Sequence, residues 1–279
     1  MEEQQITKKS QEAEKPTRQA DEMSFLEHLE ELRWRLIKGF IGIAIGIVIS
    51  FVFSHFLISK VLLGPTKSSF FVYHLLGIKA QSLNLQSRKL PGQFFAYWGT
   101  LLVMGAVIGA PLFIYEIWAF VEPAFERSGK LKTLLNTLFI SFFFILGVSF
   151  GYLILVPFAL QFFNHFRISN NIRNLFDINA YFSSVSMWIL SCGVIFQLPV
   201  VSYFLSKFGV ITPDFLKKYW RHSIVVCFIV AAFLTPPDPI SQLLVAIPLI
   251  LLYQLAIFVS KIGMRKREKE QEEAFSEEW

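Results

Sequence analysis

Five long stretches of this sequence are almost free of charged side chains, and no other feature limits the fold so strongly. Residues 39–59, 133–166 and 179–206 contain no Asp, Glu, Lys or Arg, and residues 91–121 contain only Glu116. Each stretch has the roughly 20 residues that an α-helix needs to cross about 30 Å of hydrocarbon. Because a helix pairs its own backbone groups, the pattern predicts helices that span a membrane.

The fifth stretch, residues 222–260, is long enough for two helices and is interrupted once. Its only charge is Asp238, which lies in Thr235–Pro239, where three of the five residues are proline. Such a run cannot continue a helix, so we expect two spans joined by a tight turn, and six spans in all. The span from His222 to Leu234 would be only about 20 Å long, so the turn should lie below the membrane surface.

Small residues and prolines inside the spans indicate close packing and bent helices. Three pairs have the spacing that lets helices approach closely, and they are Gly42/Gly46, Gly105/Gly109 and Gly147/Gly151. Four prolines should kink or interrupt spans, and they are Pro111, Pro157, Pro199 and Pro248. The expected fold is therefore an all-α polytopic membrane protein whose kinked helices form a concave bundle.

The distribution of Lys and Arg predicts which side each loop faces. Of the 26 basic residues, 19 precede the first span, follow the sixth, or lie between spans 2 and 3 or spans 4 and 5. Positively charged loops stay in the cytoplasm, so both termini should be cytoplasmic. The pI of 9.1 thus reflects topology and not nucleic-acid binding. A composition of 54% hydrophobic and 17% charged residues excludes a large soluble enzyme.

Polar segments flank the predicted membrane domain, which covers residues 23–260. Residues 1–22 and 261–279 are rich in charge, and we expect both to be cytoplasmic tails, disordered over residues 1–22 and 265–279. No apolar segment of a cleavable signal precedes the first span, and Glu2 and Glu3 argue against an organellar transit peptide. The expected location is the bacterial cytoplasmic (inner) membrane.

A helix that lies on the membrane surface is expected over residues 24–36, immediately before the first span. Ser24 and Glu27 have the spacing of a capping box, which favours a helix start. An apolar stripe at helical spacing follows, formed by Phe25, Leu29, Leu32 and Leu36. The pattern is typical of an amphipathic helix that continues into the span.

Glutamates on the polar side of this helix are unusual, because an anionic leaflet favours Lys and Arg. The three are Glu27, Glu30 and Glu31. One hypothesis pairs Glu30 with Arg33 and Glu31 with Arg35 at helical spacing. The other makes the carboxylates a docking site for a cationic peptide.

The sequence has no constellation typical of an enzyme or a metal site. Its five histidines form no ligand pair at helical spacing, its two cysteines have no metal-type spacing, and it has no phosphate-binding loop. We therefore expect no catalytic residue, no metal and no cofactor. A small-solute permease is the alternative function, and Gln197 beside Pro199 is its best intramembrane polar candidate.

Motifs in three segments point to a known family. The segments are His28–Leu36 (HLEELRWRL), Ala110–Ala124 (APLFIYEIWAFVEPA) and Leu234–Gln242 (LTPPDPISQ). Together they resemble TatC, the multispanning component of the twin-arginine protein translocase. The resemblance covers nearly everything from Ser24 to Ser260.

The resemblance implies a receptor and core subunit. TatC proteins bind the paired-arginine signal peptides of folded cargo on the cytoplasmic side and recruit single-span subunits of the TatA and TatB type. The proton-motive force drives export, and the receptor is expected to be homo-oligomeric within a hetero-oligomeric complex. By motif position, Glu31 matches the acidic contact for the arginine pair, and Arg33 is its neighbour. A carboxylate binds a guanidinium through two parallel hydrogen bonds, so the role suits Glu31.

The sequence departs from the family pattern in the loop between spans 2 and 3. The family usually carries a second acidic residue where this chain has Gly129. We predict that Glu126, three residues earlier, supplies the second carboxylate. Glu122 is the weaker candidate, because Pro123 fixes it nearer the membrane.

The resemblance to the family also implies roles for further polar residues in the spans. Gln197 and Gln254 stand where the family often has Glu, and both are expected in the interior, with Gln197 as a buried hydrogen-bonding hub. A partner's span should dock near the turn between spans 5 and 6, at Thr235, Asp238 and Gln242. Asp238 could instead satisfy backbone N–H groups of the turn. Glu116 could reach the headgroups or pair with a neighbour on its helix.

Overall fold

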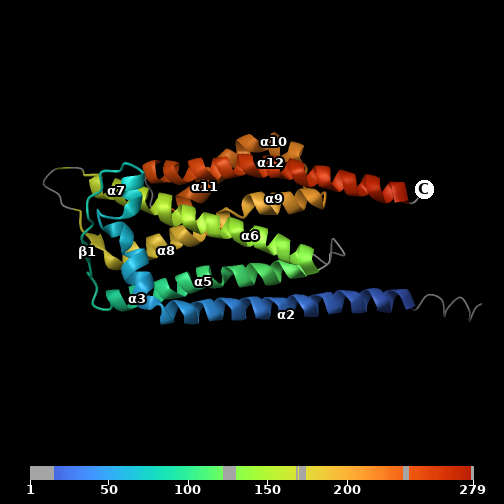
Figure 1. Cartoon of the computed structure of the whole chain (residues 1–279), viewed down its shortest axis with the longest axis horizontal. Coiled ribbons are helices and arrows are strands. Elements are labelled where there is room, and N and C mark those ends of the chain that lie inside the picture. The colour runs from blue at the N-terminus through green and yellow to red at the C-terminus, as the bar shows by residue number, and fades with distance from the viewer. Residues whose placement is uncertain (1–15, 122–129, 168, 170–173, 235–238, 278–279) are drawn as a thin grey trace, which may run out of the picture.

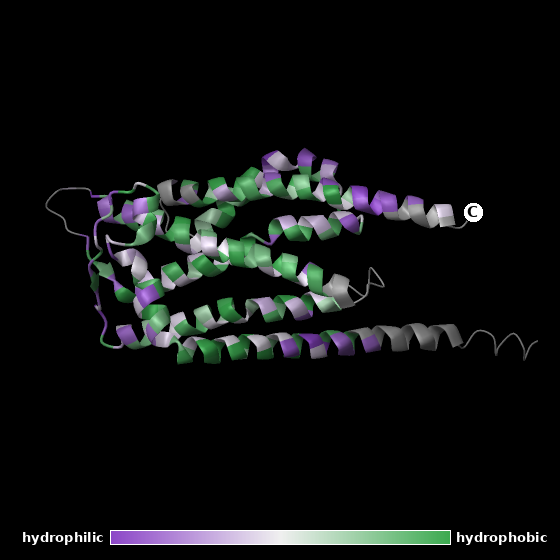
Figure 2. Ribbon diagram, in the orientation of Figure 1, coloured by the Kyte–Doolittle hydropathy of each residue, from purple (hydrophilic) through white to green (hydrophobic). Residues whose placement is uncertain are grey.

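The computed structural model describes residues 16–121, 130–167, 169, 174–234 and 239–277. Long helices lie along a common axis in Figure 1, and Figure 2 shows that apolar residues cover most of their length. A shorter apolar helix covers Trp220–Phe233. Five segments are long and apolar enough to cross a membrane, and they are Leu29–Val52, Gly92–Phe120, Leu134–His165, Ile178–Lys207 and Val245–Lys269. The all-α polytopic fold is confirmed, and the fifth of the six predicted spans is short, as expected.

The first long helix, α2 (Pro16–Val52), is one continuous element. The helix expected over residues 24–36 is part of α2 and continues into the span as predicted, since Leu36 to Gly39 stay helical. Ser24 lies within α2 and is not its N-cap. Residues 16–22, expected in a disordered tail, are also helical.

The second span is a single helix, whereas the third consists of connected helical segments. The second span is α5 (Gly92–Val121). In the third, α6 (Lys130–Phe150) continues through the π-helix η4 (Gly151–Leu155) into α7 (Val156–His165). Pro157 is the second residue after the π-helix, and its missing N–H fits a change in the hydrogen-bond ladder there.

The fourth span is broken, as its proline predicts. It consists of α8 (Ile178–Ile195) and α9 (Leu198–Lys207), separated by Phe196 and Gln197. Pro199 occupies the first turn of α9, where its missing N–H costs nothing. Residues of α8 form the centre of the main core, where Val185, Trp188 and Ile189 are almost fully buried.

The last three helices are α10 (Pro213–Lys218), α11 (Trp220–Leu234) and α12 (Pro239–Glu277). The short α10 lies against α12 (Figure 1), and the Tyr253 hydroxyl donates a 2.8 Å hydrogen bond to the Leu216 carbonyl. Because α12 continues to Glu277, residues 261–277 extend the last helix well beyond the predicted span. This part is rich in Glu, Lys and Arg, which are good helix formers.

Glycines make the contact between α2 and α5 unusually close. A methyl group added at Gly46 would lie 2.5 Å from the backbone nitrogen of Gly109, and one added at Gly109 would lie 2.6 Å from the carbonyl oxygen of Gly42. Near the same contact, the buried Ser50 hydroxyl donates a 2.7 Å hydrogen bond to the Leu101 carbonyl. The two glycine pairs thus face each other, as their spacing predicts.

A cap of short elements covers one end of the bundle. Its elements are α3 (Ser54–Phe56), the π-helix η1 (Leu57–Leu62), the 3-10 helix η2 (Gly64–Thr66), α4 (Phe71–Leu75), β1 (Leu85–Gln86) and β2 (Phe176–Asp177). The two strands pair in parallel, with Leu85 opposite Phe176, which the sequence analysis does not predict. Asp177 then caps α8, and hydrogen bonds from backbone N–H groups, that of Ala180 first, hold the pKa of its carboxyl below the usual value.

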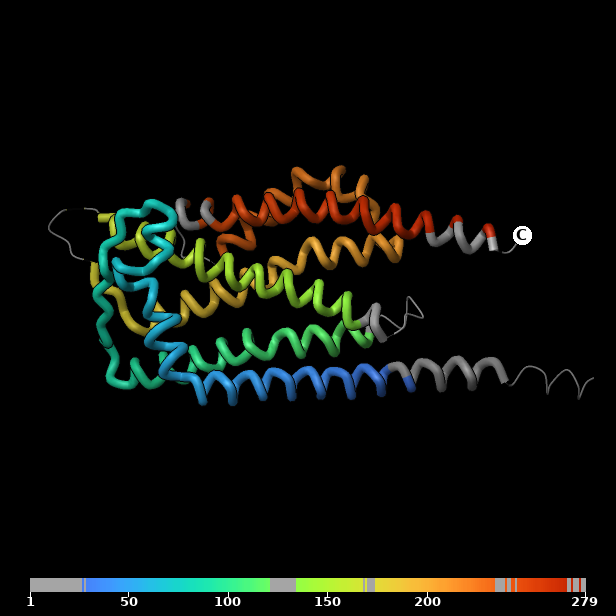
Figure 3. The backbone as a smooth tube through the Cα atoms, in the orientation of Figure 1, coloured from blue at the N-terminus to red at the C-terminus, as the bar shows by residue number. Residues whose placement is uncertain are grey.

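Two tyrosines, Tyr181 and Tyr152, join this cap to the long helices, and a third, Tyr73, makes a hydrogen bond within the cap. Helix ends leave carbonyl groups without partners, and here tyrosine hydroxyls donate to them. Tyr181 bonds the Leu62 carbonyl at 2.6 Å, Tyr152 bonds that of Val61 at 2.8 Å, and Tyr73 bonds that of Pro65 at 2.6 Å. The opposite end of the bundle carries the start of α2 and the end of α12 (Figure 3).

Candidate functional site

Arg35 joins two carboxylates that come from different helices. Its Nη2 lies 3.1 Å from Oε1 of Glu31, one turn earlier on α2, and its Nη1 lies 3.5 Å from Oε2 of Glu116 on α5. The predicted Glu31–Arg35 pair is confirmed. Glu116 pairs across the helix contact and not with a neighbour on its own helix. The three side chains are partly buried, since 27% of Arg35, 41% of Glu31 and 17% of Glu116 is exposed.

This cluster carries more negative than positive charge. Two carboxylates share one guanidinium, and both hydrogen bonds from Arg35 to Glu31 end on Oε1, at 3.1 and 3.3 Å. Among the described residues, nothing donates a hydrogen bond to Oε2 of Glu31. The Oε2 atom of Glu116 is buried and accepts no hydrogen bond from the described part of the chain. The cluster can therefore accept another cationic donor.

Arg33 and Glu30 form a separate pair on the outer side of α2. Their charged groups lie 3.7 Å apart, and 69% of Arg33 and 56% of Glu30 is exposed. This pair was also predicted. An exposed pair of this kind contributes under about 1 kcal/mol, so Arg33 is easily drawn to another partner.

Four of the predicted site residues lie outside the described residues. They are Glu122 and Glu126 of the loop and Thr235 and Asp238 of the turn. The helices beside the loop show where it is attached. The end of α5 and the start of α6 lie toward the end of the bundle where α12 finishes (Figure 1).

A hollow of about 410 Å³ lies between α5, α6 and α9, and nearly all of its wall is apolar. Gln197 lines it and donates one long hydrogen bond, 3.4 Å, to the Ile140 carbonyl. The indole Nε1 of Trp118, which also lines the hollow, is buried and has no partner among the described residues. The half-buried side chain of Gln197 thus has a single hydrogen-bond partner in the described part of the chain and is not the buried hydrogen-bonding hub that was expected.

The other two predicted glutamines differ in their surroundings. Gln254 is exposed, so the expectation of an interior position is wrong. The reason is helical phase: α12 buries Leu252 and Ala256, and a residue midway between them faces the opposite side. Gln242 donates a 3.0 Å hydrogen bond to the Phe228 carbonyl on α11. It lines an apolar hollow of about 290 Å³ beside Phe233, which is 86% exposed.

The sequence analysis missed the link between Glu116 and the Glu31 region. The sequence does contain a signal for this link: Glu116 is the only charged residue in its span, and a charge within a span needs a partner. No group of three or more His, Cys, Asp or Glu side chains that could hold a metal ion occurs within the described ranges.

Comparison with known proteins agrees with these features. Residues 27–248 match the model of the family described as Sec-independent protein translocase protein (TatC). A relative of that name from Blattabacterium sp. subsp. Periplaneta americana is 36% identical over 261 residues, covering 88% of this chain and 98% of the relative. The TatC of Desulforapulum autotrophicum is 34% identical and covers 92% of each chain.

A solved structure extends the likeness to three dimensions. The crystal structure of a twin-arginine translocase receptor, TatC, superposes with a TM-score of 0.72 at 32% identity, over 85% of this chain and 99% of that one. Both the sequence and the helix arrangement thus lead to one assignment. This multi-pass membrane protein belongs to the TatC family of Sec-independent protein translocase proteins.

Proposed function

We propose that this chain is the receptor and core subunit of a twin-arginine translocase. It binds the paired-arginine signal peptides of folded proteins, recruits single-span TatA- and TatB-like subunits, and supports export driven by the proton-motive force. It acts in the bacterial cytoplasmic membrane, with both termini inside, as a homo-oligomer within a larger complex. The name of the solved relative, a twin-arginine translocase receptor, supports this assignment.

The half-exposed carboxylate of Glu31 is the observation that carries the proposal. Arg35 engages only its Oε1, so an arginine of the signal peptide finds Oε2 ready to accept. A charge-assisted hydrogen bond of this kind contributes about 1.5–3 kcal/mol when it is partly desolvated. Arg33 lies on the same helix and pairs weakly with Glu30, and among the described residues it makes no ion pair with Glu31.

Because Arg35 also contacts Glu116, it can release Glu31 to the peptide and still keep an ion-pair partner. When a signal arginine takes Glu31, Arg35 keeps its contact with Glu116, 3.5 Å away. The bound state then has two guanidinium groups and two carboxylates, whereas the empty cluster has one guanidinium for the same two acids. Neutralisation of this excess charge favours binding.

The second arginine of the peptide needs a further acid. Glu126 and Glu122 belong to the segment between Val121 and Lys130, which follows α5 directly, and α5 carries Glu116 only five residues before its end. We assign Glu126 to this role and give Glu122 the smaller share, since Pro123 restricts it.

The partner subunits dock on the short α11 and the start of α12. The 15 residues of α11 are about 22 Å long, less than the hydrocarbon thickness. The apolar hollow beside Gln242 and the exposed Phe233 form an apolar surface for another span. Thr235 and Asp238 belong to the segment of the sequence between α11 and α12.

The alternative, a small-solute permease, gains no support from the interior hollow. Such a site needs several convergent polar groups near the middle of the membrane. Here Gln197 and the Trp118 indole are the polar groups in an apolar wall. This lining favours an apolar occupant.

Photo-cross-linking of a signal peptide to the membrane-embedded protein tests the proposal. We expect cross-linking to require the arginine pair, to be lost in Glu31→Lys, to weaken markedly in Glu126→Lys and to change least in Glu122→Lys. Glu268→Lys, an exposed site on α12, is the matched control and should behave as the wild type. Intact arginine-dependent cross-linking in Glu31→Lys would refute the receptor site.

A further inference from the structure

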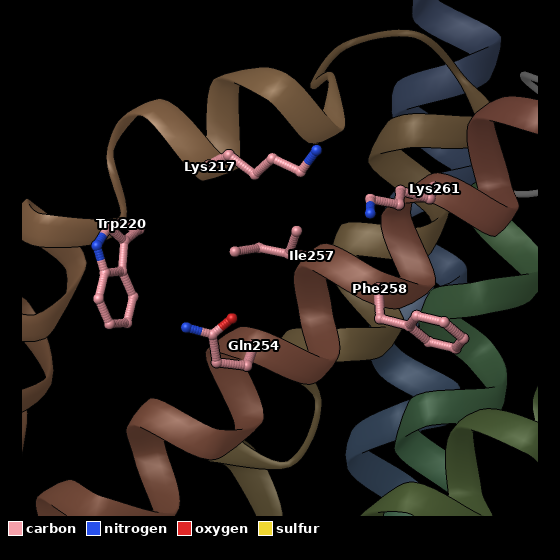
Figure 4. A pocket seen from close by; sticks show the side chains of 6 residues that line it. All are labelled: Lys217, Trp220, Gln254, Ile257, Phe258 and Lys261. Carbon is pink, nitrogen blue, oxygen red and sulfur yellow. The ribbon is translucent and has the colours of Figure 1, made fainter.

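A basic site, separate from the acidic cluster on α2 and α5, lies on other helices of the bundle. Figure 4 shows a hollow of about 410 Å³ between α10, α11 and α12. Six residues line it, and they are Lys217, Trp220, Gln254, Ile257, Phe258 and Lys261. Nothing in the proposed receptor role uses these residues.

The charges around this hollow favour an anion. Lys217 and Lys261 extend toward one another from opposite sides of it (Figure 4). None of the six lining residues is acidic. Asp214 lies 3.6 Å from Lys217 but is 92% exposed, so the pair is weak. Among the described residues, no carboxylate lies within ion-pairing distance of Lys261. Two facing ammonium groups repel each other unless an anion lies between them.

The remaining wall of the hollow is apolar and continues into the membrane-facing surface. Ile257 is buried, whereas Phe258 is 61% exposed. Further along the same helices, Val225 of α11 and Leu251 of α12 are also exposed, at 59% and 64%. Trp220 lies at the edge, a position that tryptophan favours at headgroup level. A small soluble anion would make no contact with this apolar surface, whereas the acyl chains of a lipid would cover it.

We propose that this hollow binds the phosphate of an anionic glycerophospholipid. The phosphate lies between Lys217 and Lys261, Gln254 and the Trp220 indole offer N–H donors to the headgroup, and the acyl chains follow the apolar surfaces of α11 and α12. Basic pockets between spanning helices are a recurrent form of lipid site.

The walls of the site are preformed, because hydrogen bonds fix both ends of α10 in the absence of a ligand. The Tyr253 hydroxyl holds the end of α10 to α12 through the Leu216 carbonyl, one residue before Lys217. At the start of α10, the Thr212 hydroxyl accepts the Phe215 N–H at 3.2 Å. A preformed site loses less conformational entropy on binding, which favours a specific lipid over a diffuse lipid layer.

The experiment uses the full chain in nanodiscs of phosphatidylcholine with a rising fraction of phosphatidylglycerol. Native mass spectrometry counts the phosphatidylglycerol that stays bound. The test variant is Lys217→Ala with Lys261→Ala. The matched control is Lys218→Ala with Lys266→Ala, which removes two charges from the same two helices but none from the hollow. Because one lysine near an anionic headgroup contributes roughly fivefold in affinity, we expect about a 25-fold loss in the test variant. The control should lose about threefold or less.

Several outcomes would overturn the proposal. An equal loss in both double variants would indicate diffuse surface charge, and no loss in the test variant would exclude the site. Displacement of the lipid by inorganic phosphate would indicate a site for soluble anions. The single variant Lys261→Gln, at an exposed position, should show an intermediate loss and provides the result if the double variant fails to fold.

Discussion

One arginine sets the electrostatics of the proposed receptor site, the cluster of Glu31, Arg35 and Glu116. Arg35 contacts Glu31 on its own helix and Glu116 on the neighbouring one, and it leaves acceptor atoms of both carboxylates without hydrogen bonds from the described residues. An arginine already present in the site thus shows how an arriving guanidinium can be held. The proposed role of Glu116 is to keep the charged Arg35 paired with a carboxylate when Glu31 changes partner.

Replacing Glu116 with Gln should weaken signal-peptide binding by about fivefold, the value of one partly exposed ion pair. The reason is that Arg35 would then depend on Glu31 alone and compete with the peptide for it. Titration of a fluorescent signal peptide against the purified receptor measures this change. Unchanged or tighter binding would show that Glu116 has no part in the exchange.

Replacing Gln197 with Leu should impair transport more than peptide binding. The amide lies in the wall of the interior hollow and bonds the Ile140 carbonyl, far along the sequence from Glu31. Transport assays in membrane vesicles, run beside the binding titration, separate the two effects. Normal transport by this variant would make Gln197 a packing residue only.

At the scale of single residues, the sequence predicts ion pairs within one helix but not ion pairs between helices. The Glu31–Arg35 and Glu30–Arg33 pairs follow from helical spacing. The Glu116 contact depends on how α2 and α5 are aligned, which no local pattern encodes. Gln254 was misplaced for a similar reason, because the rotation of α12 about its axis is set by its packing.

Among the elements, the contact between α2 and α5 controls the position of the receptor site. The facing glycines bring the two backbones together, and the same contact brings Arg35 within reach of Glu116. A larger residue at this crossing must separate the helices. The site therefore depends on packing that lies several turns away from it.

Replacing Gly46 with Ala should destabilise the protein by about 1–3 kcal/mol, as overpacking does in a filled contact. The added methyl group would meet the backbone of Gly105 and Gly109. Gly99→Ala is the control, because a methyl group there meets nothing within 4 Å. Thermal unfolding in detergent should give a lower midpoint for the first variant only. Equal midpoints for the two would contradict the close contact.

Helix existence was easier to predict than helix ends. Charge-free stretches revealed the long helices, and Pro199 revealed the break in the fourth span. The start of α2 at Pro16 and the end of α12 at Glu277 were missed, because charged segments rich in Glu, Lys and Arg form helices as readily as tails. The β1–β2 pair, of two residues per strand, is too short to leave a pattern.

On the scale of the whole molecule, the two ends of the bundle differ in construction. One end carries the tyrosine-bonded cap, and the other carries the helix ends at which α2 starts and α12 finishes. The excess of Lys and Arg in the segments at this second end is the basis for assigning it to the cytoplasm.

Labelling with a membrane-impermeant maleimide tests this orientation. Leu90, fully exposed in the cap region, and Glu272, exposed near the end of α12, are the positions to change to Cys. Leu90→Cys should be labelled in intact spheroplasts, and Glu272→Cys only after permeabilisation. Cys192 and Cys227 are buried, so the background should be low. The reverse pattern would invert the proposed topology.

The central claim is that Glu31 directly binds an arginine of the signal peptide, and a double-mutant cycle measures this contact. Binding is titrated for wild type and Glu31→Gln, each with a peptide carrying the arginine pair and with one in which one arginine is Gln. We predict a coupling free energy of about 1.5–3 kcal/mol between Glu31 and one of the two arginines. Additive losses for both arginines, with coupling near zero, would show that Glu31 acts elsewhere and would contradict the account.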